Sequence, residues 1–145
     1  MNQKTIDEYQ GWLKETSWYG HAGEHNAKEM AYLMLGLSGE TGELADAFKK
    51  IVREVGFDSK EGFEALMKEQ KLELIDELGD VMWYMAQICN YFGVNLTTLM
   101  AFNAAKLHRR LADNYKYQDT PWPFSDPMLS LENVDNARSL TKRYG

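Results

Sequence analysis

The stretch GLSGETGELADAFKK, residues 36–50, shows helical periodicity although it contains glycine at positions 36, 39 and 42. Glycine in a helix interior costs roughly 1 kcal/mol relative to alanine, so three of them indicate some other requirement. Two acids, Glu40 and Glu43, lie among these glycines. Since glycine removes side chains from the surface, we expect a ligand, metal-bound waters or another backbone to approach the acids. Close helix packing alone is the alternative interpretation.

This stretch belongs to a helix predicted from Asn26 to about Val55. Asn26 is a suitable N-cap, and Glu29 follows at capping-box spacing. Apolar residues recur mostly three or four positions apart, which predicts one buried face. These residues are Met30, Leu33, Leu37, Leu44, Phe48, Ile51 and Val55.

Helical patterns also cover most of the remaining chain up to residue 113. A first helix is predicted from Thr5, with Glu8 at capping-box spacing, to about Trp18. A short helical piece is expected at 61–69, and a clearer helix follows with its apolar row at Leu74, Leu78, Val81, Met85, Ile88 and Phe92, ending at Gly93. A last helix starts at Asn95 or Thr97 and ends near Asp113, after the basic turn KLHRR. The predicted class is all-α, a bundle of four to five helices.

The chain changes character at Asn114. Its three prolines, at positions 121, 123 and 127, all lie in this last part, among aromatic and polar residues. We therefore expect an extended C-terminal arm, residues 114–145, that packs on the body or on a partner subunit. Residues 1–113 form the predicted helical catalytic domain.

Composition excludes several functional classes. A length of 145 residues with 44% hydrophobic residues is typical of one globular domain. No apolar run approaches the roughly 20 residues that span a bilayer, so we expect a soluble, cytoplasmic protein without a membrane partner. The single cysteine, Cys89, has apolar neighbours and indicates a buried thiol. A formal charge of −6 argues against a partner of duplex nucleic acid.

Two pairs of acids border the predicted core rows. Glu40 and Glu43 share one face of their helix, and Glu77 and Asp80 share one face of the next long helix. If these helices pack through their apolar rows, four carboxylates converge and repel one another unless cations are bound. Oxygen ligands without a nearby cysteine or histidine favour Mg²⁺, for which Mn²⁺ can substitute, over Zn²⁺.

Other interpretations of these acids remain open. Acids three positions apart are common on solvated helix surfaces, and the protein is then a non-enzymatic helical module whose arm recruits a partner through Trp122 and Phe124. A carboxylate-bridged di-iron bundle is disfavoured because it needs Glu-x-x-His pairs, whereas the histidines lie at 21, 25 and 108.

The sequence also resembles a known family. GETGE, followed by ELIDELGDVMWY and NAAKLHRR, is similar to the signature of the MazG-like all-α nucleoside triphosphate pyrophosphohydrolases, and the resemblance covers roughly residues 28–110. It implies Mg²⁺-dependent hydrolysis of a nucleoside triphosphate, preferably a deoxynucleotide, to the monophosphate and pyrophosphate by a homodimer or homotetramer. A guanosine alarmone or a damaged nucleotide is the alternative substrate. The link between the two acidic pairs is longer than is usual in this family.

The resemblance also implies residue roles. The metal ligands are Glu40, Glu43, Glu77 and Asp80, and Tyr84 matches a tyrosine that lies beside the nucleotide in related enzymes. Candidates for phosphate contact are Lys50, Asn103, Lys106 and either Arg109 or Arg110. A glutamate not fully committed to metal, Glu40 or Glu43, is expected to accept the proton of the attacking water. In the first loop, the candidates for contact with the base or a phosphate are Trp12, Trp18, Tyr19, His21 and His25.

Overall fold

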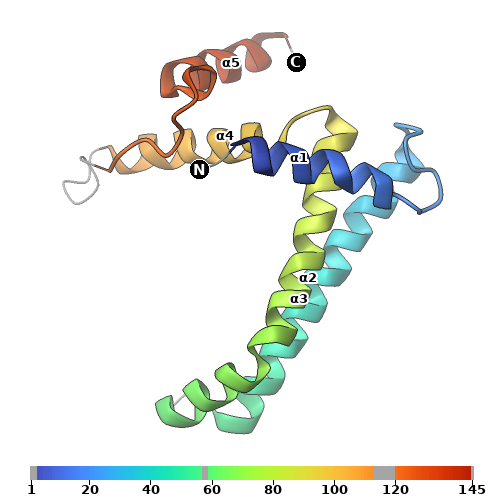
Figure 1. The fold of residues 1–145 in the computed structure, drawn as a ribbon, viewed down its shortest axis with the longest axis vertical. Coiled ribbons are helices and arrows are strands. Elements are labelled where there is room, and N and C mark those ends of the chain that lie inside the picture. Colours follow the sequence, from blue (N-terminus) through green and yellow to red (C-terminus); the bar gives the residue numbers. More distant parts are fainter. Residues whose placement is uncertain (1–2, 57–58, 113–119, 145) are drawn as a thin grey trace. The chain divides into compact units, whose positions relative to one another are not determined.

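The structure is a computed structural model that describes residues 3–56, 59–112 and 120–144 (Figure 1). The described residues form α-helices and short 3-10 turns and include no strand, so the predicted all-α class is confirmed. The helices are α1 (Gln3–Leu13), α2 (Ala27–Val55), α3 (Lys60–Phe92), α4 (Leu96–Leu111) and α5 (Leu131–Tyr144), with 3-10 turns η1 (Lys14–Thr16) and η2 (Pro127–Leu129). None of the described helices is long and apolar enough to cross a membrane.

The chain forms two compact units. One unit is Leu13–Phe92, and the other joins Met1–Trp12 to Gly93–Gly145. The domain boundary predicted between Asp113 and Asn114 lies outside the described residues and stays a prediction.

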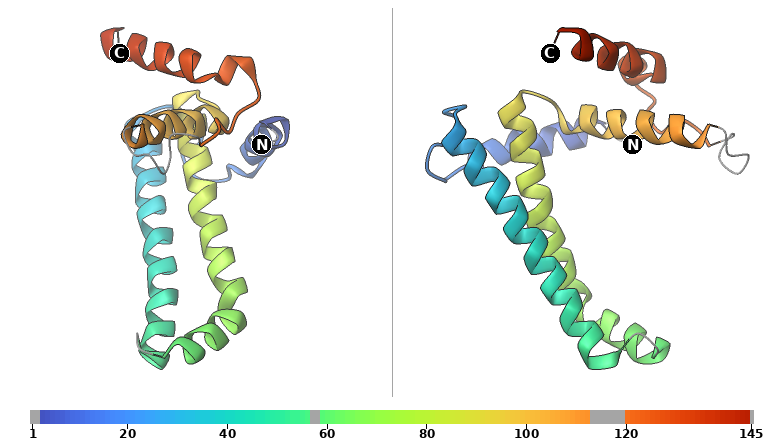
Figure 2. Two further views of the ribbon diagram at one scale, coloured as in Figure 1. Left: turned by 90° about the vertical axis from the view of Figure 1, so that its left-hand side faces the viewer. Right: turned by 180° about the vertical axis from the view of Figure 1, so that it is seen from behind.

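The unit Leu13–Phe92 is built on a helical hairpin in which α2 and α3 run side by side (Figure 2). The predicted bounds of α2 are confirmed, because the Asn26 side chain accepts hydrogen bonds from the backbone N–H groups of Lys28 and Glu29, each at 3.0 Å. At the other end Gly56 has a φ of 69°, a left-handed conformation that suits glycine. Helix α2 therefore begins at a side-chain cap and ends at a glycine, as the sequence predicted.

Helix α3 is longer than predicted. The sequence pattern suggested a separate piece at 61–69, but Lys60–Phe92 is one continuous helix. Residues 70–73 contain neither glycine nor proline, and Leu74 is buried against α2, so nothing in this segment breaks the helix. Its predicted end is confirmed, since Gly93 follows with a φ of 67°.

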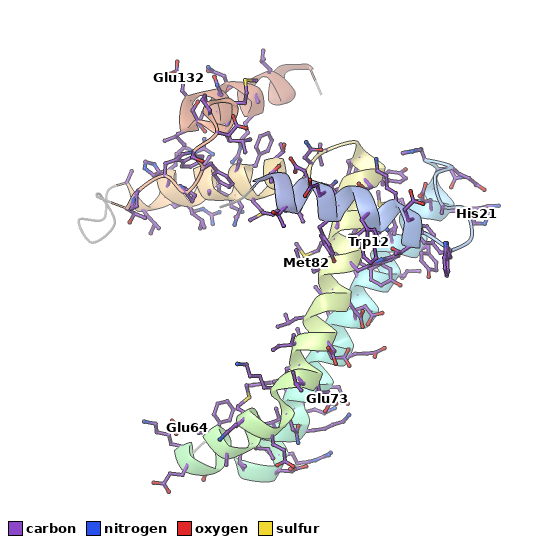
Figure 3. The ribbon with its side chains drawn as sticks, viewed as in Figure 1. Trp12, His21, Glu64, Glu73, Met82 and Glu132 are labelled. Atoms are coloured by element: carbon purple, nitrogen blue, oxygen red, sulfur yellow. The ribbon has the colours of Figure 1, made fainter. Side chains whose placement is uncertain are left out.

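The hairpin buries only part of its apolar surface. Ala47, Ile51 and Leu74 form a buried cluster, yet Leu78, Met85 and Phe92, predicted to face the core, are 51%, 39% and 65% exposed. Two packed helices can cover only one strip of each other, so the flanks stay open. One flank is apolar and the other carries acids: Met82 and Glu73 extend to opposite sides of α3 (Figure 3). We call the open apolar flank the apolar face, formed by Met34, Phe48, Ile75, Leu78, Met82 and Met85.

In the other unit, α1 is tied to the start of α4. The Gln10 side chain donates to the Val94 carbonyl at 2.8 Å, and the Thr97 hydroxyl donates to Asp7 at 2.9 Å. Helix α1 already includes Gln3, so the prediction that Thr5 caps this helix is wrong. Gln3 and Lys4 are themselves favourable helix residues, which explains the earlier start.

The C-terminal arm is only partly extended. Residues 120–126 lead into η2 and then into α5, a helix that sequence reasoning missed. The arm packs on α4 through a cluster of Ala101, Ala105, Leu129 and Val134, and Trp122 donates its ring N–H to the Leu129 carbonyl at 2.8 Å. The three-residue spacing of Leu131 and Val134 after Pro127 was the available signal for this helix.

Candidate functional site

Three of the four predicted ligand residues come together on the hairpin. Carboxylate oxygens of Glu40 and Glu43 on α2 and of Glu77 on α3 all lie within 4.8 Å of one another. The i,i+3 spacing puts Glu40 and Glu43 on one face of α2, and the packing of α3 on α2 places Glu77 beside them. We call Glu40, Glu43 and Glu77 the acidic cluster.

Asp80 does not belong to this closest set, but its charge acts on it. Burial raises the pKa of Glu40, and the charges of Glu43, Asp80 and Glu77 raise it further. The pKa of Glu77 is also raised, by burial first and then by Glu43 and Asp80. Four carboxylates therefore share one electrostatic environment, and no cation is among the causes of either shift. Such an arrangement is unfavourable until positive charge enters it.

The chemistry of the cluster fits a hard divalent cation. Every donor is a carboxylate oxygen, the ligand type that Mg²⁺ and Mn²⁺ prefer, and no histidine or cysteine belongs to the group. Oxygens bound at about 2.1 Å from one Mg²⁺ lie up to roughly 4 Å apart, so small side-chain rotations suffice to close the cluster on an ion.

The three glycines of the opening stretch serve different purposes. A Cβ atom at Gly36 would overlap the ring of Tyr84, so this glycine permits close packing of α2 and α3. No atom lies within 4 Å of a Cβ built at Gly39 or Gly42. Both interpretations given above therefore apply: Gly36 serves packing, and the other two leave free space along the helix that carries the acids.

Tyrosine rings extend from the acidic cluster toward one end of the hairpin. Burial, a hydrogen bond with Tyr32 and the charges of Glu40 and Asp80 together raise the pKa of Tyr84 to about 12, so it is a neutral phenol close to the acids. The Tyr32 ring lies 6.3 Å from that of Tyr84, and Tyr19 stacks on Tyr32 at 4.7 Å and 8°. We call Tyr19, Tyr32 and Tyr84 the tyrosine row.

A buried carboxylate, Glu29, was not predicted as a functional residue. It is 3% exposed and accepts hydrogen bonds from the backbone of Gly23 and His25 and from Tyr19. Burial raises its pKa, but these bonds outweigh burial, so the net pKa lies below its ordinary value and the group stays ionised. Glu29 also borders a polar pocket of about 370 Å³. Its place three residues after Asn26 was visible in the sequence only as a capping signal.

The predicted phosphate-binding residues are divided between the two compact units. Lys50 is on α2, where its amino group is 3.3 Å from Asp46, which also binds Lys49. Asn103, Lys106 and Arg109 are on α4, in the other compact unit, and Arg109 pairs there with Asp135. Within the unit Leu13–Phe92, Lys50 is therefore engaged with Asp46, and the contacts expected from α4 stay predictions.

Of the candidates predicted in the first loop, Tyr19 and His25 line the polar pocket beside Glu29, whereas Trp18 and His21 face the solvent. Trp18 is 93% exposed, and His21 is exposed, with its ring 3.0 Å from Glu24 and a φ of 70°. Neither is among the residues that line the polar pocket beside Glu29.

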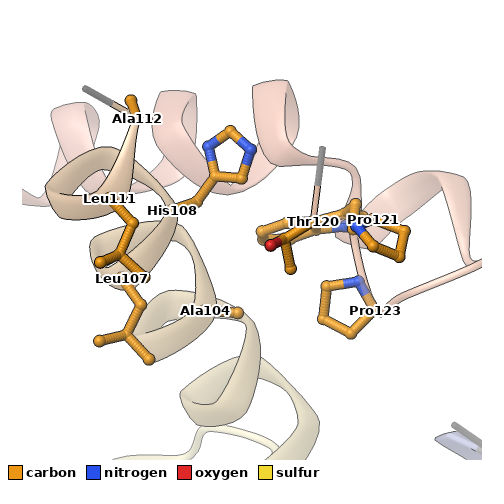
Figure 4. A pocket seen from close by; sticks show the side chains of 9 residues that line it. Ala104, Leu107, His108, Leu111, Ala112, Thr120, Pro121 and Pro123 are labelled. Carbon is orange, nitrogen blue, oxygen red and sulfur yellow. The ribbon is translucent and has the colours of Figure 1, made fainter. Parts of the chain in front are cut away.

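A second pocket is apolar and lies in the other unit. It has a volume of about 450 Å³ and is formed between α4 and the arm (Figure 4). Among the described residues, its lining includes Leu107, His108, Leu111 and Pro121 and no acid. It lacks the oxygen ligands of the acidic cluster, so we do not assign the metal centre to it.

Fold and site together define a class: an all-α protein whose helical hairpin holds a carboxylate cluster suited to a divalent cation. Residues 28–113 match the family model of the MazG nucleotide pyrophosphohydrolase domain, and the chain belongs to this family.

Two relatives extend the comparison. The chain is 40% identical to the "Gene 37 protein" of Mycobacterium phage L5 over 106 residues, which are 72% of this chain and 87% of that protein. It is 39% identical to "Uncharacterized protein YvdC" of Bacillus subtilis (strain 168) over 71 residues, 49% of this chain and 65% of that protein. No solved structure matches the chain.

The family that the sequence resembles is thus confirmed. Membership supports nucleotide pyrophosphohydrolase activity in general, and the family is typically dependent on divalent metal ions. The acidic cluster is where the described residues offer ligands for such an ion.

Proposed function

We propose that the protein hydrolyses a nucleoside triphosphate, preferably a deoxynucleoside triphosphate, to the monophosphate and pyrophosphate with Mg²⁺. The observation that carries this proposal is the convergence of Glu40, Glu43 and Glu77 from two helices without a neutralising cation. A polyphosphate substrate brings metal ions with it, and the cluster becomes favourable when they bind.

In this proposal Glu40, Glu43, Glu77 and Asp80 hold the metal. When bound, Mg²⁺ neutralises the phosphates and polarises the attacking water. Glu40 or Glu43 accepts the proton of that water.

The substrate is held at two further places. The tyrosine row borders the acids on one side, so the nucleoside part lies against Tyr84, with Trp18 and His21 of the first loop available to the base. Outer phosphates carry charge beyond the metal, and Lys50, Asn103, Lys106 and Arg109 are the proposed contacts. Lysine serves as a point charge and arginine as a bidentate donor.

The decisive experiment is a product analysis with each common ribo- and deoxyribonucleoside triphosphate and Mg²⁺. Release of monophosphate and pyrophosphate is expected. Diphosphate with inorganic phosphate contradicts the proposal, and no turnover of any nucleotide favours a non-enzymatic helical module.

Variants locate the site in the same assay. Glu43→Ala and Asp80→Ala are expected to lose at least about 100-fold in kcat/KM while the far-ultraviolet circular dichroism stays that of the wild type. Glu64→Ala is a matched control, because Glu64 is an exposed acid of α3 that forms an ion pair with Lys60.

The proposal includes a homodimer, or a tetramer of such dimers, formed through the apolar face. Its six side chains are 39% to 51% exposed and together present on the order of 500 Å² of apolar surface, near the upper end for a monomer. A standard interface buries about 800 Å² per partner, and its core is more apolar than the rest. A second hairpin offers the same length and the same apolar residues, so a two-fold pairing covers both copies.

Light scattering after size exclusion tests this assembly. Met82→Glu is expected to reduce the measured mass to that of a smaller species, because a charge is placed in the buried interface. Leu35→Glu is the matched control: Leu35 is 73% exposed and points away from the apolar face, since it follows Met34 by one position. A wild-type protein with the mass of one chain contradicts the proposal.

A further inference from the structure

The loop between η1 and α2 is held by hydrogen bonds and by ring contacts of Tyr19 and His25. None of the residues 17–26 is fully buried. Two of them, His21 and His25, have φ values of 70° and 50°, a region that costs energy for residues other than glycine. Such a conformation persists only when neighbouring groups fix it, so the contacts of this loop determine its shape.

Glu29 makes three contacts with the C-terminal half of the loop and Tyr19, and Tyr91 of α3 adds a hydrogen bond from its hydroxyl to the Asn26 carbonyl at 3.3 Å. The Glu29 carboxylate accepts the N–H of Gly23 and of His25, each at 2.7 Å, and the Tyr19 hydroxyl at 3.1 Å. Because Glu29 lies in the first turn of α2, the helix dipole also favours its negative charge.

Helix α3 holds the other end of the loop. The Trp83 ring N–H donates to the Thr16 hydroxyl at 2.9 Å, and the Gln87 amide donates to the Leu13 carbonyl and the Ser17 hydroxyl, each at 2.9 Å. The loop is thus tied to both helices of the hairpin. Tyr19, which lies between the two ties, can take only a restricted range of positions.

These ties determine where the tyrosine row ends. Tyr19 stacks on Tyr32, and its ring centroid lies 6.0 Å from that of Trp83 with an interplanar angle of 81°. Through Tyr32 the row continues to Tyr84, whose pKa is raised in part by the charges of Glu40 and Asp80. Flat rings beside a cluster suited to cations match a ligand with a flat base at one end and phosphates at the other, since base stacking on a ring is worth about 1–3 kcal/mol.

We propose that Glu29 is a positioning residue that holds Tyr19 over Tyr32 and thereby sets the wall against which the nucleoside part of the substrate binds. This inference rests on the proposed function. Glu29 is buried and its oxygens are already engaged, so it acts through Tyr19 and contacts no phosphate. It should therefore affect substrate binding and leave the chemical step unchanged.

Steady-state kinetics of Glu29→Gln test the proposal, with the nucleotide that the wild type hydrolyses best. Glutamine offers one acceptor oxygen in place of two, so at least one loop N–H loses its partner. We expect KM to rise about tenfold and kcat to stay within about twofold. Glu24→Gln is the matched control, because Glu24 is an exposed loop carboxylate that bonds His21 and Asn26, and the KM of this variant should equal that of the wild type.

A double-mutant cycle separates positioning from a merely structural role. Tyr19→Ala should raise KM as Glu29→Gln does, and the double variant should be no worse than Tyr19→Ala, because both act on the same ring. Tyr19→Phe keeps the aromatic ring but loses the hydrogen bond to Glu29, so it should raise KM, although less than Tyr19→Ala does. If Glu29→Gln does not fold, Tyr19→Ala alone must raise KM at unchanged kcat.

Several results overturn the proposal. One is a lowered kcat at unchanged KM in Glu29→Gln. A second is a double variant whose KM increase is the product of the increases in Glu29→Gln and Tyr19→Ala. A third is an unchanged KM in Tyr19→Ala. An inactive wild-type protein overturns the proposed function as well, whereas an active wild type with an unchanged KM in Glu29→Gln overturns this inference alone.

Discussion

Two acidic sites lie less than two turns apart on α2 and behave in opposite ways: Asp46 with its lysines, and Glu40 of the acidic cluster. Asp46 binds Lys49 and Lys50, and hydrogen bonds to these two lysines, followed by their charges, lower its pKa. Glu40 has only carboxylates among the charges that shift its pKa, and with burial they raise it. Glu40 and Asp46 each lie three residues from Glu43. Asp46 nevertheless forms solvated ion pairs with lysines, whereas Glu40 belongs to a cluster of carboxylates without a cation. The lesson is that the neighbours of an acid, more than its spacing, indicate a metal site.

Neutralising one acid in each group should give the largest difference. Glu40→Gln removes a proposed ligand or base and is expected to lower kcat/KM at least about 100-fold. Asp46→Asn removes a partner of two exposed lysines and should change it less than about threefold. Pyrophosphate release at saturating Mg²⁺ measures both, and equal effects would remove the distinction between the groups.

The glycines offer a second contrast, in stability. Gly36→Ala forces the Tyr84 ring to move and is expected to destabilise the protein by about 1–3 kcal/mol. Gly39→Ala meets open space and should stabilise the metal-free helix by up to about 1 kcal/mol. Urea unfolding of both variants checks this. A Gly39→Ala protein less stable than the wild type would show that another segment already occupies that space.

The pH dependence of metal affinity sharpens the contrast further. Raised pKa values mean that Glu40 and Glu77 keep protons at a pH at which an ordinary glutamate, with a pKa of 4.5, has lost them. Metal binding must displace these protons, so Mg²⁺ affinity should fall as the pH drops through the raised pKa values, before 4.5 is reached. Titration calorimetry in two buffers of different ionisation enthalpy measures the protons released. Affinity that stays constant down to pH 4.5 contradicts the account.

The smallest expected effect concerns the metal-free protein. A raised carboxyl pKa in the folded state lowers stability when the group is ionised, and stability returns as the pH falls below the raised pKa. Glu40→Gln should therefore raise the melting temperature without metal at pH 7 by a few degrees, because it removes the repulsion. Asp46→Asn should not raise it. Melting curves in the presence of a chelator distinguish the two variants.

These contrasts also show what the sequence could predict. Periodicity and capping residues predicted three features: Asn26 as the N-cap of α2, the end of α3 at Gly93, and the proximity of Glu40 to Glu77. Such features depend on residues within one or two turns, or on two helices that pack through continuous apolar rows. The match of residues 28–113 to the MazG family agrees with the quoted motifs.

Other features could not be predicted because they depend on distant partners. Glu29 is an ordinary capping glutamate in the sequence, and only the folded loop brings Tyr19 and the backbone of Gly23 to it. The continuity of α3 was missed because residues 70–73 are polar apart from Leu72. Helix α5 was missed because its apolar residues form a recognisable buried face only when they pack on α4. Leu78 is exposed because two helices alone cannot cover it.

The most direct test of the central claim is the binding of Mn²⁺, followed by electron paramagnetic resonance, to the wild type, Glu77→Gln and Asp46→Asn. The account predicts bound Mn²⁺ in the wild type and in Asp46→Asn, with affinity reduced at least about tenfold in Glu77→Gln. Equal Mn²⁺ binding by all three proteins, or none by the wild type in the presence of nucleotide, would contradict it.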